Sequence, residues 1–170
     1  DDLFLTVEEL AERLPFIAKR MRVRDASRRQ FVAIFENAVD AIIIIDDRGS
    51  ILQFNQAAQK VFGYSLEDVI GQNVSMLMPH RYSRNHDRYI SNYLETGKRK
   101  VIGIGREVEG QRKSGDVFPM DLALSEFTTE GSVFFAGIVR DISERRRLEH
   151  EILRTSEHER RRVGQDLHDG

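Results

Sequence analysis

The chain has 170 residues, of which 40% are hydrophobic and 32% charged, so it can form one domain of ordinary size with charged helices outside its core. Its formal net charge of −2 argues against nucleic acid as a partner, and its lack of cysteine excludes disulfides, thiolate metal sites and iron–sulfur clusters. The longest aliphatic run, 41–45, is far shorter than the roughly 20 residues that span a bilayer. We therefore expect a cytoplasmic segment without membrane contact.

The first 36 residues predict a helical linker or dimerisation segment. Pro15 lies within the apolar pattern, so we expect a kink or a break there and a second helical stretch from Phe31. The apolar residues of the first stretch form a stripe on one side of the predicted helix. Because this stripe has no obvious partner inside a compact domain, it predicts a parallel homodimer. Four residues at a 4–3–4 spacing form the stripe: Leu10, Leu14, Ile17 and Met21.

The pattern changes to strands after Asp40. Residues 41–45 and 51–54 are short apolar runs on either side of the turn DDRG at 46–49, which predicts a hairpin. Asn55 can cap a short helix that Gly63 ends, and the SLED sequence at 65–68 can cap the next turn.

One longer helix and three strands follow. The helix is predicted at 82–96 and the strands near 99–112, 116–128 and 132–140, with turns at 114–115 and 130–131. The charged remainder predicts a helix, and we expect its arginine clusters at 145–147 and 160–162 to be solvated. The fold class is therefore α+β: a five-stranded antiparallel sheet with short helices on one face and a helix on either side in sequence. Alternation in the middle strand places four residues on one face: Phe118, Met120, Leu122 and Leu124.

Four stretches carry a family resemblance: Gly49, NQAA at 55–58, FGY at 62–64 and GIVRDISER at 137–145. In this order they resemble the PAS family, over roughly residues 27–145. The resemblance implies a sensor domain at 27–142 whose last strand passes into a signalling helix at 143–170. The flavin and iron–sulfur sensors of this family use cysteine or tryptophan, which this chain lacks. Haem, a small metabolite or an empty scaffold remain.

His86 is the candidate metal ligand. It shares the apolar stripe of the predicted helix with Tyr89, Ile90, Tyr93 and Leu94, where a histidine is either a hydrogen-bonded core residue or an axial ligand to haem iron.

Two further sequences favour the ligand. HDRYI at 86–90 and IGIGR at 102–106 resemble the FixL-type haem PAS oxygen sensors. That resemblance implies haem b, with His86 as the proximal ligand and Arg106 moving between a haem propionate and bound oxygen. It also implies an apolar distal wall formed by four residues: Val101, Met120, Leu122 and Leu124.

Two positions depart from that family. Lys100 stands where close relatives carry a histidine that contacts a propionate, and Asn92 stands where they carry a second propionate arginine. Lysine can still neutralise a propionate. The main hypothesis is therefore a haem PAS module that senses oxygen or another diatomic gas. The alternatives are a haem-free PAS domain for dimerisation and relay, and a PAS domain that binds a small metabolite.

The last twelve residues, ERRRVGQDLHDG at 159–170, resemble the phosphoacceptor box of NarX/DesK-type histidine kinases. The resemblance implies that His168 accepts phosphate and that Asp169 is the base, with Asp166 as an alternative acid. A weak apolar repeat predicts an adjustable coiled coil before it. We expect ATP and a response regulator to act only with the full-length kinase, and this segment to be inactive alone.

Overall fold

The computed structural model describes residues 7–81 and 106–168, and the chain divides into two units at residues 38 and 39. The first unit contains one helix, α1 (Val7–Asn37). The predicted break at Pro15 is wrong, because one helix continues through this proline. Phe31 belongs to the same helix and stacks on Phe35 at 5.7 Å between ring centroids.

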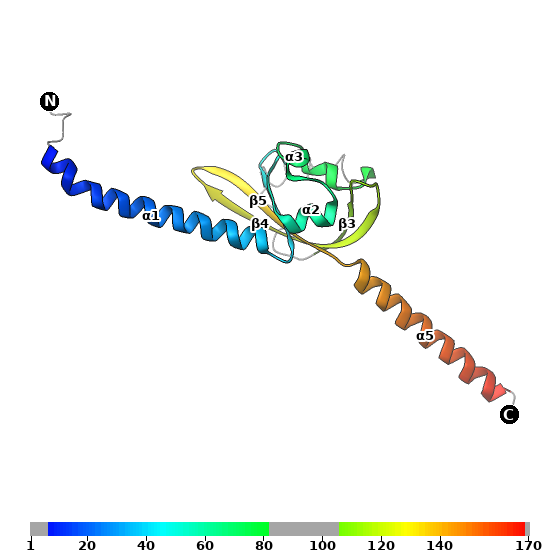
Figure 1. Cartoon of the computed structure of the whole chain (residues 1–170). Coiled ribbons are helices and arrows are strands. Elements are labelled where there is room, and N and C mark those ends of the chain that lie inside the picture. The colour runs from blue at the N-terminus through cyan, green and yellow to red at the C-terminus, as the bar shows by residue number, and fades with distance from the viewer. Residues whose placement is uncertain (1–6, 82–105, 169–170) are drawn as a thin grey trace. The chain divides into compact units, whose positions relative to one another are not determined.

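The second unit contains the predicted five-stranded antiparallel sheet, in the order β2-β1-β5-β4-β3 (Figure 1). The α+β fold class is therefore confirmed. The predicted helix at 82–96 and residues 99–105 of the predicted strand lie outside the described residues. The strands are β1 (Ala41–Asp46), β2 (Ile51–Phe54), β3 (Arg106–Gln111), β4 (Val117–Thr129) and β5 (Ser132–Asp141).

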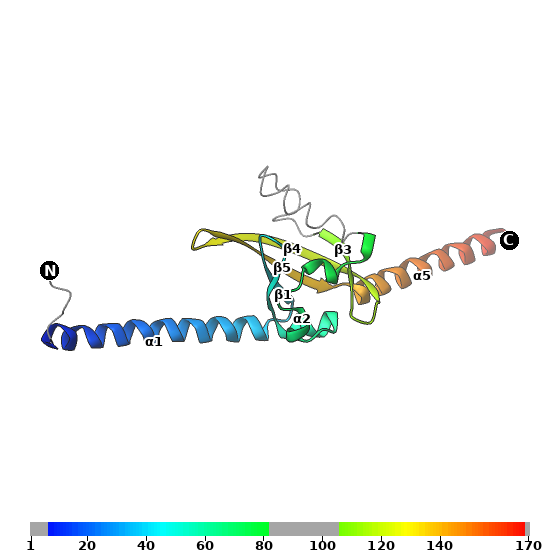
Figure 2. The ribbon, with the colours of Figure 1, turned by 90° about the horizontal axis from the view of Figure 1, so that it is seen from above.

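The short helices gather on one face of the sheet, which we call the inner face (Figures 1 and 2). They are α2 (Gln56–Phe62), α3 (Leu66–Val69) and the 3-10 turn η1 (Val74–Leu77). Phe62 is fully buried against Phe54 and Phe118, with ring centroids 6.2 and 5.6 Å away. This aromatic cluster fixes the helices on the sheet, since each ring removes a large apolar area from water.

The turns of the hairpins lie where the sequence predicts them. Gly49 and Gly115 adopt positive φ, and Glu130 and Gly131 both do so in the two-residue turn between β4 and β5. Positive φ at both central positions gives a turn whose twist matches that of the strands. The long β4–β5 hairpin therefore pairs without a register shift from Met120 to Thr129.

Asn55 performs more than the predicted capping of α2. Its side chain is fully buried, and its Oδ1 accepts hydrogen bonds from the Ala58 amide at 3.0 Å and the Ile42 amide at 2.9 Å. Its Nδ2 donates to the Asp40 carbonyl at 3.1 Å. One amide thus joins β1 to the start of α2.

Replacing Asn55 with alanine is expected to lower the free energy of unfolding by about 2–4 kcal/mol, because the cap is lost and buried polar groups lose their partner. Asn73 is the matched control, since it is only half-buried and its Oδ1 caps η1 by accepting from the Ser75 amide at 2.9 Å. Asn73→Ala should cost about 1 kcal/mol. Urea unfolding measures both, and equal losses would contradict the special role of Asn55.

Candidate functional site

The inner face of β3 and β4 carries the described part of the predicted haem pocket. Directly opposite residues of an antiparallel pair point to the same side of the sheet. Arg106 is paired with Leu122, and Val108 is paired with Met120. Because Met120 is a core residue, Arg106 also projects to the inner face, beside the predicted apolar wall.

The apolar wall meets a glycine of the neighbouring strand. Met120 is buried, whereas Leu122 and Leu124 are half-buried. Gly137 of β5 lies opposite Leu124. A Cβ atom at Gly137 would lie 3.5 Å from the Leu124 side chain and 3.6 Å from that of Leu122. These are ordinary contact distances, so a glycine of β5 packs beside two half-buried leucines on the inner face.

The structure brings together only some of the predicted site residues. It places Arg106, Met120, Leu122 and Leu124 on one face of adjacent strands, with Arg106 exposed at the start of β3. The predicted residues His86, Lys100 and Val101 lie outside the described residues. The described part is therefore an apolar surface with one cation at its edge.

The junction between the sheet and the C-terminal helix α5 (Ser143–His168) holds a polar cluster that sequence reasoning missed. Asp141 Oδ1 accepts from the Ser143 amide at 2.9 Å, and its Oδ2 accepts from Arg112 at 2.5 Å. Arg112 also lies over the Phe118 ring, 3.9 Å from its centroid. Ile142, between the two polar residues, is buried. Ser143, two positions after Asp141, was the sequence signal that could have predicted this hydrogen-bonded turn.

Acid should weaken this junction. Burial, the largest influence, raises the pKa of Asp141, but the hydrogen bonds from Arg112 and Ser143 together lower the pKa below its ordinary value. A carboxyl group with a depressed folded-state pKa stabilises the fold above its unfolded pKa, and this stability is lost as the pH falls through the folded pKa. Asp141→Asn should therefore destabilise the domain by about 1 kcal/mol at pH 7 and flatten its acid dependence below about pH 5. Urea titrations at several pH values test this, and parallel stability curves for the two proteins would contradict it.

The predicted phosphoacceptor lies at the exposed end of α5. His168 is the last residue of this helix, and Asp166 is also exposed, whereas Asp169 lies outside the described residues. Every described residue of α5 is at least partly exposed. The apolar positions Leu153 and Leu167 are 63% and 79% exposed, so α5 has a surface available to a second helix. In the described ranges, 7–81 and 106–168, no helix has the length and apolar character needed to cross a bilayer.

Comparison with known proteins identifies the family. A model of the PAS fold matches residues 29–142, which include the whole sheet and the helices on its inner face. The chain therefore belongs to the PAS family.

Its relatives include sensor proteins. Sensor protein FixL of Bradyrhizobium diazoefficiens is 39% identical over 142 residues, which are 84% of this chain and 27% of FixL. Oxygen sensor protein DosP of Escherichia coli is 37% identical over 113 residues, which are 66% of this chain and 14% of DosP. The PAS domain of an HTR-like protein from Haloarcula marismortui has the same fold, with a TM-score of 0.60 at 24% identity, over 74% of this chain and 99% of that one. The chain thus spans only about a quarter or less of the length of FixL and DosP.

Proposed function

We propose that this chain is the haem-binding PAS module of a sensor histidine kinase and that it senses oxygen or another diatomic gas. The observation that carries the proposal is the pairing of Arg106 with the half-buried Leu122, which puts a cation at the edge of an apolar surface on the inner face. The 39% identity with Sensor protein FixL supports the same assignment.

The described residues fit a haem. A porphyrin needs a flat apolar surface, which Met120, Leu122 and Leu124 provide, together with a cation for its propionates, which Arg106 provides. His86 would be the axial ligand, and Lys100 and Val101 would complete the propionate contacts and the apolar wall. The iron would supply the position at which the gas binds. The chain's own contribution is to orient the ligand, to exclude water from it and to present the guanidinium.

Titration with hemin tests the proposal. The expected result is stoichiometric uptake with a Soret band, as histidine-ligated haem proteins show. A protein that stays colourless in excess hemin would overturn the proposal and favour the haem-free PAS domain for dimerisation and relay.

Arg106→Ala is expected to weaken oxygen binding by roughly 1–3 kcal/mol and carbon monoxide binding by much less. The guanidinium can donate a charge-assisted hydrogen bond to bound oxygen, which in such a pocket carries more negative charge than carbon monoxide. Equilibrium titration with each gas measures the difference. Arg106→Lys keeps the charge but lacks the planar guanidinium, so its oxygen affinity should lie between those of the unchanged protein and Arg106→Ala. Equal losses for both gases would indicate a solvent-facing arginine without a role in sensing.

The output step completes the proposal. We place a parallel homodimer contact along α1 and α5, supported by exposed apolar residues on both helices, including Ile34, Ile152 and Leu153. A weak seam suits two registers of similar energy, which a sensor domain can bias. In the full-length kinase this bias would reach His168, and from there a response regulator.

A further inference from the structure

Two acidic residues face each other on the outer face of the sheet, opposite to the predicted pocket. Glu107 of β3 is paired directly with Asp121 of β4. Like charges at such a position repel, so the pair requires a cation nearby. One cation is Arg140 of β5, which is paired directly with Asp121. The first turn of α5 supplies another, since Arg145 donates to Glu107 at 2.7 Å and to Asp121 at 3.3 Å.

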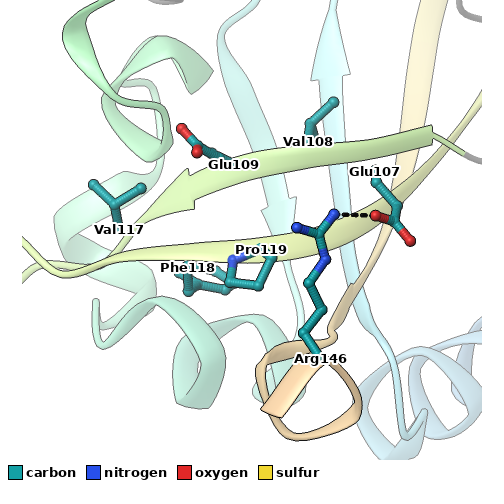
Figure 3. A pocket seen from close by; sticks show the side chains of 7 residues that line it. All are labelled: Glu107, Val108, Glu109, Val117, Phe118, Pro119 and Arg146. Atoms are coloured by element: carbon teal, nitrogen blue, oxygen red, sulfur yellow. Dashed lines mark hydrogen bonds and ion pairs between the residues drawn. The ribbon is translucent and has the colours of Figure 1, made fainter. Parts of the chain in front are cut away.

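Arg146 adds a second cation from α5. Its guanidinium pairs with the other carboxylate oxygen of Glu107, as the dashed line in Figure 3 shows. The hydrogen bond from Arg146 is the main reason that the pKa of Glu107 lies below its ordinary value. Glu107 is therefore charged at neutral pH and holds two guanidinium groups from the helix.

We propose that Glu107, Asp121, Arg145 and Arg146 form a helix clamp that couples the position of β3 to the start of α5. Successive side chains of a strand point to opposite faces, so Arg106 projects to the inner face and Glu107 to the outer face. A movement of β3 that accompanies a change at Arg106 therefore acts directly on the first turn of α5. This path is separate from the covalent continuation of β5 into α5 through Asp141.

The clamp is built to open at low cost. Its four side chains are all partly exposed, and such ion pairs contribute little net free energy. Arg145 also has an alternative carboxylate in its own helix, since its Nε lies 3.7 Å from Glu149. A cavity of about 340 Å³ beside Arg146, lined also by Val117 and Pro119, gives this side chain room to move (Figure 3). An element with two arrangements of similar energy can transmit a small bias.

The third arginine of the same cluster provides the matched control. Arg147 pairs only within the helix in the described structure, with Glu144 at 2.7 Å and Glu151 at 3.3 Å. It has the same charge and a similar exposure, but both of these partners lie in α5 and not in the sheet. A change at Arg147 perturbs the helix without touching the clamp.

Hydrogen exchange of the purified chain tests the clamp. Arg145→Gln with Arg146→Gln should raise amide exchange in β3, an edge strand, by roughly three- to tenfold, because the strand loses its tie to the helix. Arg147→Gln should leave exchange in β3 unchanged. Conversely, Glu107→Gln should raise exchange in the first turns of α5, whereas Glu109→Gln, at the next outward position of the same strand, should not.

Combining the changes gives the decisive comparison. Because Glu107→Gln already opens the clamp, adding both arginine changes should raise exchange in β3 little further. Unchanged exchange in the double arginine variant, or the same increase from Arg147→Gln, would overturn the clamp. The role of the clamp in signalling rests on the proposed function, but its existence does not. A protein that binds no hemin and still shows this coupling would overturn haem sensing and leave the clamp standing.

Discussion

His86→Ala is expected to abolish stable haem binding while leaving the domain folded. The axial bond is the attachment that the proposal gives between the protein and the iron. Without it, the haem affinity should fall more than about tenfold, which corresponds to ~1.4 kcal/mol. The fold should survive because Phe54, Phe62 and Phe118 pack on one another within the described residues. The measurement is the Soret absorbance after hemin titration and gel filtration, with circular dichroism as the check on folding.

His80→Ala is the matched control for that experiment. His80 is an exposed residue near the start of the same segment, and its replacement should leave hemin uptake unchanged. Restored uptake on adding imidazole to His86→Ala would show that the missing group is the ligand itself. Normal haem binding by His86→Ala would place the axial ligand elsewhere and remove the basis for the pocket residues predicted with it.

Local turn and cap chemistry made most of the fold predictable. Asn55 before α2, Ser65 before α3 and Gly131 between β4 and β5 each favour a particular backbone conformation, and the structure has it. Such signals act within a few residues, so sequence alone contains them. Pro15 was misjudged because proline weakens a helix by a fixed local amount that the rest of a long helix can offset.

Contacts between distant segments were not predictable in the same way. The cluster at 145–147 was interpreted as a solvated helix face, and all three arginines are exposed, but that interpretation did not predict that Arg145 and Arg146 pair with the sheet. Their partner Glu107 lies 38 positions from Arg145, and only the antiparallel register of β3 and β4 places that carboxylate on the outer face. The register also places Arg106 of β3 beside Leu122 of β4. The alternation predicted for β4 alone could not show which residue of β3 lies opposite Leu122.

His168→Gln is expected to remove all phosphoryl label in a protein that extends from this chain through its catalytic domain. Glutamine keeps the size and a hydrogen-bonding amide but has no imidazole nitrogen to attack a phosphoryl group. His168 is suited to this role because it is exposed at the end of α5, where a partner domain can reach it. The measurement is incorporation of label from the γ-phosphate of ATP, followed by an acid-stability test.

Two other histidines of α5 make the experiment specific. His150 and His158 are exposed on the same helix, so His150→Gln and His158→Gln test whether any surface imidazole can accept the label. Both variants should label as the unchanged protein does. Asp169→Asn should slow the labelling without removing it, because an adjacent acid orients and deprotonates the imidazole but does not receive the phosphate. Acid-labile label that persists in His168→Gln would place the phosphoacceptor outside this helix, and α5 would then serve only to connect the sensor to it.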